Sequence, residues 1–113
     1  MKLNSNPNFA TSISFYERFV EDIVAGDKSI TIRDSADINF PLNKAIDAVI
    51  FQTDDVFARL YISSITPLSF DEINAYHAQQ ENMTIVELKQ VIREIYPDQN
   101  QFYLIEFTLV EPH

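Results

Sequence analysis

The chain has 113 residues, enough for one domain with a single core and too few for two. Its 17 acidic residues outnumber its 8 basic ones, and the formal charge of −9 disfavours a nucleic-acid partner, because affinity for a phosphate backbone comes from lysine and arginine. No apolar run approaches the roughly 20 residues of a membrane span, and without cysteine there is neither a disulfide nor thiol chemistry.

The N-terminal part of the chain predicts a lead-in, a helix and a strand. We expect residues 1–12 to be a flexible polar lead-in and residues 13–110 to form a single domain. Residues 14–17 have the spacing of a capping box, so a helix should begin there. It should end at Gly26, the only glycine of the chain, where a residue of positive φ is wanted. A strand over residues 29–33 should follow.

The remainder of the chain alternates between strand and helix signals. We expect strands over residues 45–52 and 56–64, helices over residues 70–80 and 84–95, and a last strand over residues 102–110. Ser69 and Thr84 each open a capping box, and Pro67 should end the strand that precedes Ser69. Helices inserted between strands indicate the α+β class, with a small curved sheet or barrel.

Candidate chemistry concentrates just after Gly26, where Lys28 and Thr31 lie three residues apart. A threonine hydroxyl becomes a nucleophile only when a base takes its proton. Lysine can be that base when burial or a nearby cation lowers its pKa from about 10.4 toward neutrality, and Arg33 is such a cation. The ordinary roles stay open, because threonine also suits a strand and lysine an exposed loop.

The carboxylate that we single out is Glu81, at the junction of two predicted helices, although a solvated loop charge is an equally ordinary role for it. His77 fits a surface or half-buried helix position, and with His113 it forms no metal-ligand spacing. Asp34 and Asp37 match no calcium-loop pattern and fit a solvated turn. We therefore expect neither a metal nor a cofactor.

The segment from Gly26 through Lys28 to Arg33 resembles the signature Gly-x-Lys-x-x-Glu-x-Arg of the ASCH domain, a PUA-like β-barrel family, with Thr31 in the place of its glutamate. That threonine makes the chain similar to a narrower group, the small bacterial N4-acetylcytidine amidohydrolases. The segments that carry this likeness are residues 31–34, 77–84, 87–89 and 95–97. Residues 40–44 depart from the group, because they lack its Gly-Asp turn.

This resemblance implies a small PUA-like or ASCH β-barrel that hydrolyses an exocyclic amide and releases cytidine and acetate. It implies Thr31 as the nucleophile, Lys28 as the activating base and Glu81 as the acid, base or orienting carboxylate. Arg33 would then contact the substrate. Such a reaction needs no metal and no other cofactor.

Two alternatives remain: an RNA-binding PUA-like module, and a ribonuclease that works without metal. The acidic charge disfavours both, so we expect a small neutral nucleoside as the partner, and neither nucleic acid nor membrane. The first residues lack the apolar segment of a secretory signal. We expect a monomer in the cytoplasm.

Overall fold

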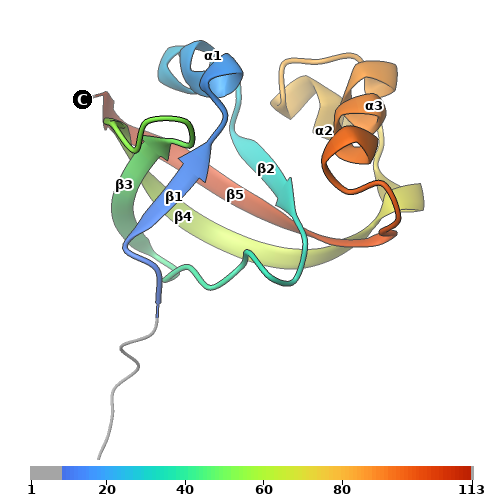
Figure 1. Cartoon of the computed structure of the whole chain (residues 1–113), viewed down its shortest axis with the longest axis horizontal. Coiled ribbons are helices and arrows are strands. Elements are labelled where there is room, and N and C mark those ends of the chain that lie inside the picture. The colour runs from blue at the N-terminus through green and yellow to red at the C-terminus, as the bar shows by residue number, and fades with distance from the viewer. Residues whose placement is uncertain (1–8, 113) are drawn as a thin grey trace, which may run out of the picture.

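A curved sheet of five strands forms the body of the protein, and the helices lie over its concave side (Figure 1). The computed structural model describes residues 9–112. The strands are β1 (Ser12–Phe15), β2 (Ile30–Arg33), β3 (Lys44–Ile50), β4 (Val56–Ser69) and β5 (Gln101–Pro112). The helices are η1 (Glu17–Phe19), α1 (Val20–Ala25), η2 (Phe70–Glu72), α2 (Ala75–Gln80) and α3 (Ile85–Ile95). The predicted α+β class is confirmed.

The strand order is β1-β3-β4-β5-β2, with β1 parallel to β3 and every other pair antiparallel. The long strands β4 and β5 pair along most of their length, and η2, α2 and α3 are inserted between them in the chain. Strand β2 pairs with β5, the strand that follows these helices in the chain. It lies beside α2 and α3 (Figure 1).

Ser14 and Phe15 belong to strand β1, so the helix predicted to begin at Ser14 is wrong in its first turn. Ile13 and Phe15 are both buried while their neighbours are partly exposed, which is the period of a strand facing a core. The parallel pairing with β3 is a long-range contact that a local capping pattern cannot reveal. Residues 1–8 of the expected lead-in lie outside the described residues.

Pro67 does not end β4, contrary to the prediction, and the strand continues to Ser69. The pairing of β3 with β4 stops at Ile62, so beyond that residue one edge of β4 has no neighbouring strand. Proline lacks a backbone N–H and is tolerated where that group would face such an edge.

The helix predicted over residues 70–80 is split in two. Ser69 receives the capping contact of Glu72 as predicted, but the turn ends at once and Asn74 starts a new helix, α2. The helix α3 is confirmed, with the Thr84 hydroxyl accepting the backbone N–H of Glu87 at 3.1 Å.

The expected closed barrel is not formed, because no ladder joins the outer strands β1 and β2 among the described residues. A side chain bridges the gap instead: Arg33 of β2 donates a hydrogen bond from Nη2 to the carbonyl oxygen of Ser14 in β1, at 2.7 Å. The edge between these two strands is where polar side chains meet. None of the described helices is long and apolar enough to cross a membrane.

Candidate active site

Three polar or charged side chains are buried among the described residues, and they are Lys28, Thr31 and Glu81. Their exposed fractions are 3%, 6% and 4%. Buried charges are costly unless they are paired or have a function, so three together at one place indicate a site. Sequence analysis singled out the same three residues.

Lys28 is aimed inward by the turn that ends α1. Gly26 takes the left-handed conformation there, with φ of 82°, and the backbone N–H of Lys28 bonds the carbonyl oxygen of Asp22 at 3.1 Å. The ammonium then donates to the carbonyl oxygen of Ile30 at 2.7 Å and forms an ion pair and hydrogen bond with Glu81.

Glu81 reaches Lys28 across 53 residues of sequence because the end of α2 is tied to the start of β2. The backbone N–H of Ser29 bonds the carbonyl oxygen of Gln80 at 2.9 Å. The next residue, Asn82, has φ of 58° and donates from its side chain to Asp22 at 3.1 Å. These ties hold the Glu81 carboxylate over the lysine.

Burial lowers the pKa of Lys28 below its usual value of 10.5, because the charged ammonium is removed from water. The Glu81 carboxylate opposes this effect and the Arg33 guanidinium adds to it. A lysine with a lowered pKa holds its proton less tightly, which is the property required of a general base.

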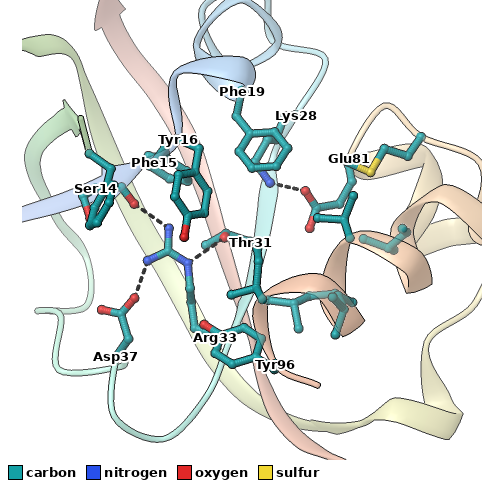
Figure 2. A pocket seen from close by; sticks show the side chains of 17 residues that line it. Ser14, Phe15, Tyr16, Phe19, Lys28, Thr31, Arg33, Asp37, Glu81 and Tyr96 are labelled. Atoms are coloured by element: carbon teal, nitrogen blue, oxygen red, sulfur yellow. Dashed lines mark hydrogen bonds and ion pairs between the residues drawn. The ribbon is translucent and has the colours of Figure 1, made fainter. Parts of the chain in front are cut away.

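Thr31 is hydrogen bonded by an arginine. The Nε–H of Arg33 donates to Thr31 Oγ1 at 2.9 Å, while its Nη1 pairs with Asp37 and its Nη2 donates to the Ser14 carbonyl oxygen (Figure 2). Among the described residues no hydrogen bond joins Thr31 to Lys28. The Thr31 hydroxyl lies beside the positive charge of Arg33, and Thr31 lines the cavity described next.

A cavity of about 170 Å³ contains all of these groups. Lys28, Thr31 and Glu81 form its polar floor, and Arg33 and Asp37 lie at one side (Figure 2). Apolar side chains line the rest of the cavity. They are Ile32 of β2, Met83 before α3, and Leu88, Val91, Ile92 and Ile95 of α3. Aromatic rings complete the lining: Phe15, Tyr16, Phe19, Phe51 and Tyr96.

The aromatic lining and Asp37 were missed from the sequence. Tyr16 and Phe51 come from different loops and meet edge to face with their centroids 5.2 Å apart, a contact without any sequence signal. Asp37 stands four residues after Arg33, and this spacing was the one available hint of a charge pair. The sequence pattern instead predicts a solvated turn at this place.

Metal ligands do not gather in the described part of the chain, where no group of three or more His, Asp or Glu side chains is placed to hold an ion. His77 serves α2 instead, its Nδ1 accepting the backbone N–H of Asn74 at 3.1 Å. His113 lies outside the described residues.

The fold is similar to that of ASCH domains. The chain superposes on the ASCH domain from Lactobacillus crispatus JV V101 with a TM-score of 0.74 at 9% identity, covering 91% of this chain and 82% of the other. It also superposes on protein EF3133 from Enterococcus faecalis V583, with a TM-score of 0.72 at 12% identity, covering 91% and 77%. At these identities the likeness shows the fold alone.

Sequence comparison narrows the class. The chain is 45% identical over 102 residues to the N(4)-acetylcytidine amidohydrolase of Pasteurella multocida, covering 90% of this chain and 98% of the relative. It is 44% identical over 95 residues to the protein of that name from Escherichia coli O1:K1, covering 84% and 92%. No protein-family model matches the chain. The chain belongs to the N(4)-acetylcytidine amidohydrolase family.

Proposed function

We propose that this protein hydrolyses N4-acetylcytidine to cytidine and acetate. The family supports the reaction, and one observation carries the site: Lys28, Thr31 and Glu81 are the buried polar residues of the described chain and line a single cavity. A hydroxyl, an amine of lowered pKa and a carboxylate are the groups that nucleophilic amide hydrolysis requires.

In the first half of the proposed reaction, Thr31 Oγ attacks the acetyl carbonyl carbon while its proton passes to the neutral amine of Lys28. The C–N bond then breaks, and the exocyclic nitrogen leaves as the amino group of cytidine after receiving a proton from the Lys28–Glu81 pair. The nitrogen lone pair is conjugated into the pyrimidine ring, which makes cytidine a tolerable leaving group. The enzyme is left with an acetyl ester on Thr31.

In the second half a water molecule attacks that ester, and acetate leaves while Thr31 regains its proton. The Glu81 carboxylate accepts the proton of the water, directly or through Lys28. Arg33 already donates to Thr31 Oγ1 in the free protein, so its positive charge lies where negative charge develops on that oxygen.

The shape and charge of the molecule support a neutral nucleoside as the substrate. The cavity is lined by apolar and aromatic side chains, which suit a pyrimidine ring and an acetyl methyl, together with a few polar groups. The chain carries a formal charge of −9, which disfavours a polyanionic substrate.

We propose that the protein acts as a monomer, because a single chain is enough to bring Lys28, Thr31 and Glu81 to one cavity. We also propose the cytoplasm as its compartment, since turnover of RNA there would release the modified nucleoside. Light scattering on the purified protein tests the monomer directly: a dimer that persists on dilution would contradict it.

The proposed reaction is tested by incubating the purified protein with N4-acetylcytidine and following cytidine and acetate by mass spectrometry. We expect equal amounts of the two products, formed without added metal and also in the presence of a chelator. The Asp47→Asn variant should release cytidine at about the wild-type rate, because Asp47 pairs with Arg59 outside the cavity. Cytidine release no faster than in buffer alone would overturn the proposal.

A further inference from the structure

We propose that Asp37 is a positioning residue of the active site, which acts through Arg33 to hold and polarise the hydroxyl of Thr31. This inference rests on the proposed function, and it gives a role to a carboxylate that lies outside the group Lys28, Thr31 and Glu81. It follows from three features: how Arg33 is held, how Asp37 is placed, and what the arrangement does to Thr31.

Arg33 is fixed at all three of its nitrogens. Nε donates to Thr31 Oγ1 at 2.9 Å, Nη2 donates to the Ser14 carbonyl oxygen at 2.7 Å, and Nη1 pairs with Asp37 (Figure 2). The guanidinium is planar, so fixing both of its outer nitrogens determines where the Nε–H points. Its face also lies over the ring of Phe15, 5.0 Å from the centroid.

Asp37 lies in the loop after β2, whereas the other two partners of Arg33, Thr31 and Ser14, lie in strands. A turn positions Asp37. In this turn the backbone N–H of Asp37 donates to the carbonyl oxygen of Asp34 at 3.1 Å, and the Asp34 side chain accepts the backbone N–H of Ala36 at 3.2 Å. Gln99, beyond α3, donates to the same Asp34 side chain at 3.2 Å. The turn is therefore tied to the rest of the fold and presents the carboxylate to Arg33.

The fixed guanidinium of Arg33 acts on the hydroxyl of Thr31. A free hydroxyl rotates about its Cα–Cβ and Cβ–Oγ bonds, whereas a charged donor fixed on the oxygen selects one orientation and stabilises the negative charge that develops on this oxygen as its proton leaves. Arg33 is the donor that bonds this oxygen among the described residues, and its side chain is only 11% exposed. The Asp37 side chain is 47% exposed, so it orients the guanidinium without isolating the site from water.

A competing role has to be separated from this one, because Asp37 also lines the cavity. Its carboxylate would accept hydrogen bonds from the ribose hydroxyls if the sugar lay beside it. A carboxylate that binds the sugar affects KM, and only for substrates that have a ribose. A carboxylate that positions Arg33 affects the chemical step with or without the sugar.

The kinetic test compares Asp37→Asn and Asp37→Glu with the wild type, using N4-acetylcytidine and the sugar-free N4-acetylcytosine. We expect Asp37→Asn to lower kcat by about tenfold on both substrates with KM within about twofold, as for the loss of one charge-assisted contact that orients a catalytic group. Asp37→Glu should recover part of the loss. The control Asp47→Asn breaks the other partly exposed Arg–Asp pair, at 2.9 Å, and should leave kcat within about twofold.

A second measurement does not depend on turnover. In ¹⁵N-labelled protein the Nε–H signal of Arg33, identified by its loss in Arg33→Lys, reports the bond to Thr31. We expect exchange of this proton with water to be slow in the wild type and in Asp47→Asn, and at least about tenfold faster in Asp37→Asn.

These outcomes separate the two proposals. If the wild type releases no cytidine, the proposed function fails, and the proton exchange still decides whether Asp37 holds Arg33. If kcat is unchanged in Asp37→Asn, or if only KM changes and only with the ribose substrate, the positioning role is overturned. Unchanged exchange of the Arg33 proton in that variant would overturn it equally.

Discussion

Some of the surroundings of Lys28 favour its charged ammonium form and others favour its neutral amine form. The Glu81 carboxylate and the rings of Phe19 and Phe15, with centroids 5.0 and 5.9 Å from Nζ, favour the ammonium. Burial and the charge of Arg33 favour the neutral amine, and burial is the largest effect. The pKa of Lys28 is consequently lowered.

This residue makes kcat/KM depend on pH. If Lys28 must be neutral to accept the proton of Thr31, kcat/KM should rise with pH through the lowered pKa of Lys28, below its ordinary 10.5. Glu81 raises that pKa, so its neutralisation in Glu81→Gln should move the rising limb to lower pH, although the rate itself will fall. A pH–rate profile of the two proteins measures the shift. A limb that stays in place or moves to higher pH would argue against Lys28 as the base.

At the scale of elements, the short helix α1 owes its end and the direction of Lys28 to Gly26. The φ of 82° lies in the left-handed region, where a residue with a Cβ is strained. Apart from its neighbours in the chain, no described residue has an atom within 4 Å of where that Cβ would be, so the strain would come from the backbone conformation.

Gly26→Ala should therefore destabilise the protein by about 1–2 kcal/mol, the cost of a left-handed conformation for an ordinary residue. Gly26→Asn should cost less, because asparagine tolerates this conformation. Chemical denaturation of the three proteins measures the difference. An alanine variant as stable as the wild type, or more stable, would mean that residue 26 does not need the left-handed backbone conformation.

Elements with local signals were predictable from the sequence. Helix α3 has its capping box at Thr84, an apolar stripe and a stop before Pro97, and strand β2 follows a helix-ending glycine. Each of these signals acts within a few residues. The fold class followed from the order of such elements.

The missed features depend on partners far along the chain. Strand β1 exists because it pairs with β3, and β4 passes Pro67 because β3 no longer faces it there. A related limit applies to the site, where Lys28, Thr31 and Glu81 were predicted from motif and resemblance. The Tyr16–Phe51 pair joins two distant loops, whereas the Arg33–Asp37 pair spans only four residues but needs the turn after β2 to form.

For the whole molecule, the 17 acidic residues outnumber the 8 basic ones, and ion pairs reduce the positive charge that a polyanion could use. Ion pairs with carboxylates engage four of the cations: Arg18 with Glu94, Lys28 with Glu81, Arg33 with Asp37, and Arg59 with Asp47. Lys89 and Arg93 lie over the ring of Phe70, at 4.9 and 3.8 Å from its centroid.

We therefore expect no RNA binding at micromolar protein concentration, even at low salt, where phosphate contacts are strongest. Filter binding of a labelled single-stranded RNA tests this, and gel analysis of the same samples tests for cleavage. Affinity that falls steeply with salt would favour the RNA-binding module over the hydrolase. Cleavage without metal would favour the ribonuclease.

The nucleophilic role of Thr31 is the central claim, and it is tested most directly by the turnover of N4-acetylcytidine by two variants of this residue. Thr31→Val keeps the shape and removes the hydroxyl, whereas Thr31→Ser keeps the hydroxyl. We expect kcat to fall by at least about 10³-fold in the valine variant, as for the loss of other catalytic nucleophiles, and to stay within about tenfold of the wild type in the serine variant. Turnover by the valine variant within tenfold of the wild type would show that another group attacks the amide.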